Sequence, residues 1–273
     1  MDKNDDISQK DLINAIGRSG YLLESEVSQA LSKAGFFVET NQSILDPLTG
    51  KSREIDILAE YYEYDKRRSE YNVCSKVNFV FEVKNNIFPL VVMTKLEYSP
   101  NTDLWSAVKE GRTAPKNFDA YEIEAYCEQL IEKRDPSIFT QYCSFSRKNR
   151  NKELMASHPE ALYSGFTKIV QYCDEMLENF QTRGPDKYHR FYLWQPILLV
   201  KDSLYEMIID KDKSPVLKEV ESTSLVFNYH RNQEPSSALI HLVTRKGLSE
   251  FLLDMLAIEK SIEDRVITKL KNV

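Results

Sequence analysis

The sequence of 273 residues predicts an α/β protein in which a mixed central sheet is flanked by helices. Three observations carry this prediction. β-rich apolar runs occur in two groups, near residues 54–93 and near 195–243, and amphipathic helical patterns precede the first group and follow the second. Between the groups the pattern changes to helical periodicity, with no Gly- or Ser-rich linker at either border. We therefore expect one sheet interrupted by a helical insertion.

The first group of elements begins with an amphipathic helix between Ser19 and Gly35. Leu23, Val27 and Leu31 recur at helical spacing, and Gly35 suits the left-handed position that ends a helix. The strands expected after it share a β-rich apolar composition and are Phe36 to Val38, Glu54 to Ala59, Val77 to Lys84 and Pro89 to Met93.

The chain is expected to divide into three segments. Residues 1–96 form the N-terminal part of the core, residues 97–187 a helical insertion with a core helix near 160–181, and residues 188–273 the strands and helix that complete the core. A second helix of the insertion is expected at about Asp119 to Arg134. The returning strands are expected at Gln195 to Val200, Leu204 to Ile209, Ser224 to Tyr229 and Ala238 to Val243.

The last helix carries an apolar stripe with two interpretations. Either the stripe covers the sheet, or it is a partner surface that forms a homodimer. The residues of the stripe are Leu248, Phe251, Leu252, Met255, Ile262, Val266 and Leu270.

Charge and composition narrow the function classes. A net charge of -6 argues against a protein that coats nucleic acid non-specifically, because such binding needs many Lys and Arg contacts to phosphate. Any nucleic-acid function must therefore be local. The four cysteines form no CxxC pair and have no ligand spacing with the four histidines, so we expect free buried thiols and no zinc site.

No targeting or membrane segment is predicted. The N-terminal residues MDKNDDISQK are acidic and polar, whereas a signal peptide is basic and then apolar. No apolar run approaches the ~20 residues that span a bilayer. We therefore expect a cytoplasmic protein that does not contact membrane.

Glu82 and Lys84 are two residues apart on a predicted buried strand. Their side chains point to the same face, about 6–7 Å apart, while Val83 turns the other way. An acid and an amine at the end of a buried strand are costly unless they pair with each other or bind something. A structural ion pair and a binding site are both consistent with these two residues.

Asp56 favours the binding site, because a neighbouring strand could bring its carboxylate beside that of Glu82. Mg²⁺ commonly receives one or two carboxylates from a protein, with water and substrate phosphate at the other positions. Such an ion, Mg²⁺ or Mn²⁺, lowers the pKa of a bound water and polarises a phosphoryl group. Lys84 would then orient or deprotonate the water, or neutralise charge in the transition state.

The order of these residues resembles the PD-(D/E)xK nucleases, the superfamily with the fold of restriction endonucleases and Holliday-junction resolvases. The resemblance rests on Glu24 in a helix, Asp56 in Arg-Glu-Ile-Asp and the Glu82-Val83-Lys84 triplet. It implies a restriction-endonuclease-like fold, metal binding by Asp56 and Glu82, and action of Lys84 on the nucleophilic water. It also implies that Glu24 joins the metal directly or through water.

The resemblance covers Ser19 to Asn86, about a quarter of the chain. Ile55 stands where the proline of the family's name would precede the aspartate, which is a departure from the motif.

Further residues are candidates for supporting roles. Glu54 shares the strand face of Asp56 but could equally be an exposed acid. Lys168 and Gln171 lie on a predicted helix where some relatives place a Gln or Tyr near the active site, although ordinary helix surface is the alternative. Nucleic-acid contacts could come from a basic stretch, for which a solvated charge run is the alternative. That stretch contains Arg147, Lys148, Arg150 and Lys152.

These residues together predict a metal-dependent nuclease that hydrolyses phosphodiester bonds. The substrate expected is DNA, cleaved internally in a restriction, defence or mobile-element setting. The alternative is a nuclease-fold module that binds nucleic acid or supports assembly without cleaving.

Overall fold

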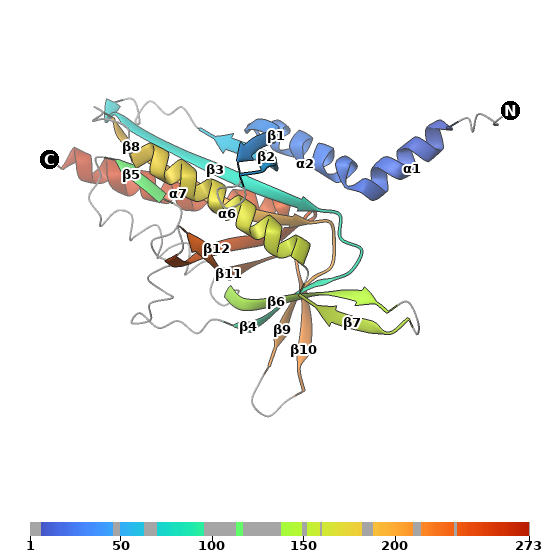
Figure 1. The fold of residues 1–273 in the computed structure, drawn as a ribbon. Helices are drawn as coiled ribbons and strands as arrows, with labels where there is room; N and C mark the ends of the chain where they lie inside the picture. Colours follow the sequence, from blue (N-terminus) through green and yellow to red (C-terminus); the bar gives the residue numbers. More distant parts are fainter. Residues whose placement is uncertain are drawn as a thin grey trace.

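The computed structural model describes residues 7–45, 50–62, 70–95, 113–116, 138–148, 152–158, 160–181, 188–209, 214–231 and 234–272. These residues form a mixed α/β fold (Figure 1). The helices are α1 (Gln9–Ser19), α2 (Tyr21–Lys33), α6 (Glu160–Gln181) and α7 (Leu248–Lys271). The strands are β1 (Phe37–Leu45), β2 (Ser52–Tyr61), β3 (Val73–Lys84), β4 (Leu90–Lys95), β5 (Thr113–Lys116), β6 (Ile138–Arg147), β7 (Leu154–Ser157), β8 (His189–Val200), β9 (Leu204–Ile208), β10 (Val216–Val220), β11 (Ser222–Arg231) and β12 (Glu234–Thr244).

One large mixed sheet connects the strands in the order β1-β2-β3-β8-β12-β11-β6-β4-β9-β10, with β5 beside β8 and β7 beside β6. The central contact is the parallel pairing of β3 with β8, which runs from Val73 opposite His189 to Lys84 opposite Val200. Both strands are buried over most of their length, as expected for parallel strands covered on both faces. The β3–β8 pair therefore forms the centre of the core.

Helices cover both faces of the sheet, α6 on one side and α7 on the other (Figure 1). The apolar cluster under α2 and α7 includes Phe79, Phe81 and Phe251. The cluster under α6 includes Val80 and Phe166. Alternate residues of β3 thus belong to opposite layers, as the two-residue period of a strand requires.

The strands that follow β3 and β8 also pair with each other. β4 follows β3, β9 follows β8, and β4 and β9 are parallel. The Asn86 side chain joins the two connecting segments, since it accepts from the Lys201 N–H at 2.9 Å and donates to the Asp202 carbonyl at 2.7 Å. A backbone hydrogen bond from Leu90 to Ser203 continues the connection. These contacts fix the chain immediately after β3 ends.

Helix α1 is attached close to the same end of β3. It ends at Gly20, whose φ of +97° lies in the left-handed region that favours glycine. The Asn85 side chain donates to the carbonyls of Gly17 and Arg18 at 2.9 and 3.2 Å. The last turn of α1 is therefore held next to the residues that follow β3.

Most predicted elements are confirmed. The N-terminal amphipathic helix corresponds to α2, the helix expected near 160–181 is α6, and the expected strands overlap β1, β2, β3, β4, β8, β9, β11 and β12. The apolar stripe of α7 packs into the core, which confirms that it covers the sheet. This stripe is thus buried within the chain, and a homodimer stays a prediction. Helix α1 and strand β10 had not been predicted.

The prediction of a helical insertion over residues 97–187 needs correction. Besides α6, the described part of this segment contains β5, β6 and β7, and β6 lies inside the sheet between β11 and β4. Ile138, Phe139 and Tyr142 bury their side chains there, so apolar packing outweighs the polar residues between them. The helix expected at about Asp119 to Arg134 lies outside the described residues.

Two further expectations concern the thiols and membranes. Cys74, Cys143 and Cys173 are free, and only Cys173 is fully buried, while Cys127 lies outside the described residues. Among the helices described, none is both long and apolar enough to cross a bilayer.

Phe79 tests the packing of the core. It is fully buried, with its ring centroid 5.7 Å from Phe36 and 6.3 Å from Phe251. We expect Phe79→Ala to lower the free energy of unfolding by about 3–5 kcal/mol, measured by urea denaturation. Phe37→Ala is the matched control, because that ring is 66% exposed, and it should cost less than about 1 kcal/mol. Equal losses in the two variants would contradict this description of the core.

Candidate functional site

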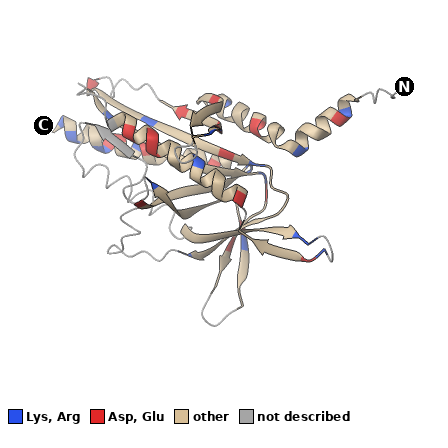
Figure 2. Ribbon diagram, viewed as in Figure 1, with Lys and Arg blue, Asp and Glu red and all other residues tan. Residues whose placement is uncertain are grey.

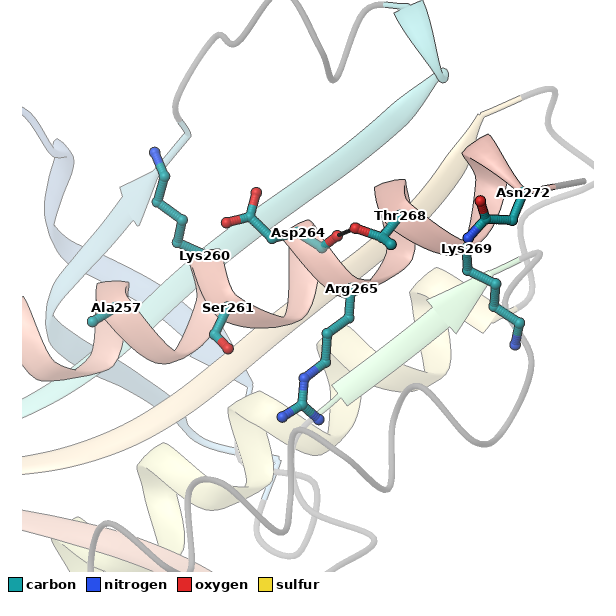
Figure 3. Close-up of a pocket in the computed structure, with 8 residues that line it drawn as sticks. All are labelled: Ala257, Lys260, Ser261, Asp264, Arg265, Thr268, Lys269 and Asn272. Atoms are coloured by element: carbon teal, nitrogen blue, oxygen red, sulfur yellow. Dashed lines mark hydrogen bonds between the residues drawn. The ribbon is translucent and has the colours of Figure 1, made fainter.

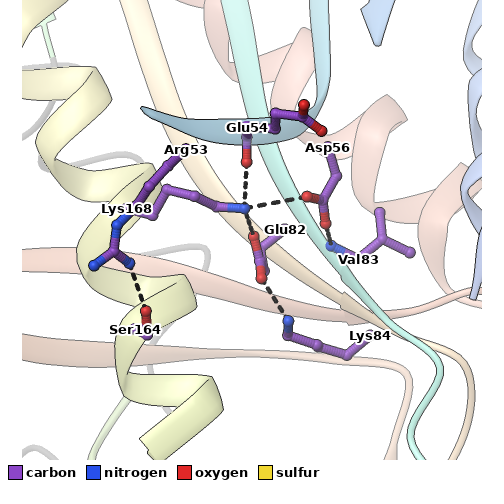
Figure 4. Close-up of polar contacts among 8 residues, drawn as sticks. All are labelled: Arg53, Glu54, Asp56, Glu82, Val83, Lys84, Ser164 and Lys168. Atoms are coloured by element: carbon purple, nitrogen blue, oxygen red, sulfur yellow. Dashed lines mark hydrogen bonds and ion pairs between the residues drawn. The ribbon is translucent and has the colours of Figure 1, made fainter. Parts of the chain in front are cut away.

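Two carboxylates from neighbouring strands meet where β3 leaves the core (Figure 4). The antiparallel pairing of the two strands ends with Ile57 of β2 opposite Phe81 of β3, and Asp56 and Glu82 are the next residues on their strands. Asp56 Oδ2 accepts a hydrogen bond of 2.7 Å from the Val83 N–H. The strand backbone therefore fixes the Asp56 carboxylate beside that of Glu82, whose side chain is only 5% exposed.

Lys168 of α6 lies between these two carboxylates. Its ammonium donates to the Glu54 carbonyl at 2.6 Å and to Asp56 Oδ1 at 3.1 Å, and it forms an ion pair with Glu82 Oε2. The side chain is 11% exposed. Two of its three N–H donors have hydrogen-bond acceptors, and the contact with Glu82 is an ion pair. Lys168 is thus the residue that joins β2, β3 and α6 at this site.

Lys84 contacts the other oxygen of Glu82. Its Nζ lies 2.6 Å from Glu82 Oε1, and its side chain is 33% exposed. The two oxygens of Glu82 therefore face two different lysines. Of the two lysines, Lys84 is the one with greater access to solvent.

Helix α6 approaches β3 closely because residue 165 is glycine. A Cβ on Gly165 would lie 2.9 Å from Glu82 Oε1 and 3.0 Å from Glu82 Cγ, too close for any other residue without movement. A hydrogen bond of 2.7 Å from Arg53 Nη1 to Ser164 Oγ ties the same turn of α6 to β2. These contacts bring the Lys168 side chain within reach of the carboxylates.

Glu24 of α2 lies close enough to interact electrostatically with both carboxylates. Burial raises the pKa of the Glu24 carboxyl, and the negative charges of Asp56 and Glu82 raise it further. Glu24 and Asp56 both line an open groove of about 560 Å³ between α2 and β1. Polar side chains such as Ser28 and Asn41 line the rest of this groove. Solvent therefore reaches the candidate site from the α2 side.

Burial and neighbouring charges have opposing effects on the pKa values of Asp56 and Lys168. Burial raises the pKa of the Asp56 carboxyl, and the negative charge of Glu82 raises it further. Lys168 and the Val83 N–H lower this pKa, but the net result is an increase. Burial lowers the pKa of Lys168, but the Glu82 and Asp56 carboxylates outweigh this effect and the net pKa is raised. Lys168 is therefore an ammonium at neutral pH, and the carboxylates favour a cation between them.

The two remaining supporting candidates lie outside this network of side chains. The Glu54 side chain is exposed, and its backbone carbonyl rather than its carboxylate contacts Lys168. Gln171 is half-buried one turn further along α6 and makes no hydrogen bond or ion pair with Asp56, Glu82 or Lys84. Lys168 is thus the supporting candidate whose side chain reaches both carboxylates.

The basic stretch belongs to the β6–β7 hairpin. Arg147 donates to the Lys152 carbonyl at 2.9 Å, and Lys148 pairs with Glu153 through their backbones at 3.0 Å. Arg150 lies outside the described residues. In the view of Figure 1 the hairpin projects from the body below the end of β3, and Figure 2 shows basic and acidic residues together on it. No contact with the carboxylates is described for these basic residues.

A larger hollow, of about 850 Å³, follows the outer side of α7 (Figure 3). Its titratable residues all come from this one helix. Lys260 and Arg265 point in different directions there, and so do Asp264 and Lys269. Because these side chains do not converge, the hollow is a weaker candidate than the site at Glu82.

The residues of the site fit a cation that takes part of its coordination from water and substrate. Within the described part of the chain, no three Asp, Glu, His or Cys side chains gather closely enough to enclose a metal ion. Asp56 and Glu82 nevertheless offer two converging carboxylates, and a positive group already lies between them. This donor set suits Mg²⁺ or Mn²⁺, which commonly bind to proteins through one or two carboxylates.

Lys168 and Gly165 were the parts of the site that the sequence indicated least clearly. The sequence predicts Lys168 as one of three supporting candidates and does not single out Gly165. Their spacing of three residues on one helix could have indicated them. The same helix carries Phe166 and Ile169, which are buried against the sheet. A glycine and a lysine on such a helix indicate close packing against an acid.

Comparisons with family models, with curated proteins and with solved structures find no match for this chain. Its function is therefore inferred from the geometry of Asp56, Glu82, Lys84 and Lys168.

The close contact between Gly165 and Glu82 can be tested with a double-mutant cycle. In the wild-type background, Gly165→Ala should reduce stability, because overpacking costs about 1–3 kcal/mol and the helix propensity of Ala returns only about 1 kcal/mol. In the Glu82→Ala background the clash is removed, so the same substitution should be neutral or stabilising. Urea denaturation of the four proteins measures the difference.

Gly17→Ala provides the matched control, since Gly17 is a helical glycine whose added Cβ would lie 4.0 Å from Leu22 Cδ2. It should be neutral or stabilising in both backgrounds. The same change in stability for Gly165→Ala in both backgrounds would show that Glu82 does not limit the approach of α6.

Proposed function

We propose that this chain is a metal-dependent nuclease that hydrolyses phosphodiester bonds, with DNA cleaved internally as the expected reaction. The observation that carries the proposal is the convergence of Asp56 and Glu82 beside Lys84, at the edge of an open groove. Two carboxylates and an amine in this arrangement supply metal ligands and a group that acts on water.

The proposed cofactor is Mg²⁺ or Mn²⁺. When bound, the ion polarises the phosphoryl group and lowers the pKa of a coordinated water. Asp56 and Glu82 would hold it. Glu24, on the other side of the groove, would contribute directly or through water.

Lys84 is proposed to act on the attacking water or on the charge that develops at the phosphate. Its ammonium is held by Glu82 Oε1 and is one-third exposed, so it lies beside the metal ligands and can still reach substrate. Directing the water and stabilising negative charge both require a positive group at this place.

The resemblance to PD-(D/E)xK nucleases supports the same assignment. Glu24 lies on the helix that precedes the strands, Asp56 on β2, and Glu82 and Lys84 on β3. A restriction-endonuclease-like fold remains part of the proposal. The β6–β7 hairpin is proposed to contact phosphates away from the site of cleavage.

Removal of either carboxylate tests the metal site. We expect Asp56→Asn and Glu82→Gln to reduce cleavage at least about 100-fold and to weaken Mn²⁺ binding, because each replaces a charged ligand with a neutral one of the same shape. The measurements are calorimetric titration with Mn²⁺ and cleavage of linear, circular and branched DNA and of RNA, in Mg²⁺, Mn²⁺ or EDTA.

Glu26→Gln is the matched control for these variants. Glu26 is an acid of α2, the helix that carries Glu24. Its carboxylate pairs with Arg245 at 3.0 Å, away from Asp56 and Glu82. It should retain cleavage and metal binding. Wild-type activity in both carboxylate variants would refute the site, and DNA binding without cleavage in any metal would favour the non-catalytic binding module.

The hairpin can be tested separately by replacing Arg147, Lys148, Arg150 and Lys152 with Ala. Nucleic-acid affinity should fall and its salt dependence should flatten, because each phosphate contact contributes a slope of about -0.9 in log K against log salt on duplex DNA. Mn²⁺ binding should not change. Binding titrations over a range of salt concentrations measure both quantities, and an unchanged slope would exclude the hairpin as a phosphate contact.

A further inference from the structure

Each carboxylate oxygen of the Asp56 and Glu82 pair has a described partner. Asp56 Oδ2 accepts from the Val83 N–H, and Glu82 Oε1 faces Lys84. The two remaining oxygens, Asp56 Oδ1 and Glu82 Oε2, both contact the Lys168 ammonium. A cation that bridged the two carboxylates through these two oxygens would have to displace the ammonium. Lys168 and a bridging metal ion therefore compete for one position.

We propose that Lys168 is a positioning residue that occupies the cation position in the metal-free protein and moves to a phosphate of the nucleic acid when the metal binds. This inference rests on the proposed function. Its consequence is that metal and nucleic acid bind cooperatively, each favouring the other.

The balance of charge explains why the two ligands are coupled. Asp56, Glu82 and the nearby Glu24 carry three negative charges against two positive charges from Lys84 and Lys168, so a divalent ion added alone leaves one excess positive charge at a mostly buried site. A phosphodiester group brings compensating negative charge. Metal without nucleic acid should therefore bind weakly, and nucleic acid should increase its affinity.

The hydrogen bonds of Lys168 lead to the same conclusion. If the ion takes Asp56 Oδ1 and Glu82 Oε2, the ammonium keeps only the Glu54 carbonyl among its three present contacts. A buried ammonium without acceptors is costly, and a phosphate oxygen at the metal offers a new one. The long, flexible lysine side chain allows this exchange while α6 stays in place.

Lys84 does not have the same role, although it carries the same charge. It contacts Glu82 Oε1 only, and no contact with Asp56 is described for it. Lys84→Met therefore removes one positive charge from the site but leaves the position between the carboxylates occupied. It is the matched control for Lys168→Met.

The experiment measures Mn²⁺ binding by electron paramagnetic resonance of the free ion, with and without a short duplex DNA. The DNA carries phosphorothioate linkages, and a gel verifies that it stays intact. In wild type, we expect the DNA to tighten Mn²⁺ binding about 10-fold or more. In Lys168→Met, Mn²⁺ alone should bind about 10-fold or more tightly than in wild type, and the effect of DNA should largely disappear.

A second readout is thermal stability. Without metal, Lys168→Met leaves two adjacent carboxylates without their shared cation, so its Tm should lie below that of wild type. Mn²⁺ should then raise its Tm more than that of wild type, because tighter binding to the folded state stabilises it more. If Lys168→Met does not fold without metal, Lys168→Gln, which keeps a donor, replaces it in both measurements.

The outcomes separate this inference from the proposed function. Lys84→Met should lose less of the effect of DNA on Mn²⁺ binding than Lys168→Met and show the smaller gain in metal affinity. Mn²⁺ binding that is lost in Asp56→Asn but is the same in wild type and Lys168→Met would overturn the role of Lys168 and leave the metal site standing. No Mn²⁺ binding in any protein, with or without DNA, would overturn both.

Discussion

Two like charges lie side by side at the edge of an apolar core, and the surrounding structure must compensate for them. Asp56 and Glu82 are 18% and 5% exposed, so water can screen them only in part. Lys168 supplies the missing positive charge from a different layer of the fold. This requirement explains why α6 lies so close to β3, why residue 165 has no side chain, and why Arg53 holds Ser164.

The acids and the lysine are held in different ways. Asp56 and Glu82 stand on paired strands, and a backbone N–H fixes one of them, so their separation is set by the sheet. Lys168 reaches the same place through a long side chain with several rotatable bonds. The site therefore combines two carboxylates fixed by the sheet with a positive group on a flexible side chain. The proposed metal site requires this combination if the protein also stays folded without metal.

The sequence was sufficient to predict what depends on local pattern. The apolar alternation of Ile55, Ile57 and Ala59 and the run from Val77 to Val83 identify β2 and β3, and with them the face shared by Glu82 and Lys84. Strand β6 was missed because its polar residues, such as Thr140 and Gln141, conceal its pattern, and its neighbours β4 and β11 are distant in sequence. The position of the Lys168 side chain likewise depends on how α6 packs against distant strands, and no local sequence pattern predicts that packing.

The distance of Lys168 along the chain also affects the order in which the site assembles. Asp56 and Glu82 lie on consecutive strands, whereas Lys168 is 112 residues from Asp56. Contacts between distant residues tend to form later, because closing a long loop costs more chain entropy. During folding the two carboxylates can thus meet before their lysine arrives. Because dissolved ions screen the repulsion between like charges, we expect the rate at which β2 and β3 pair to depend on the ionic composition of the solution in which the chain folds.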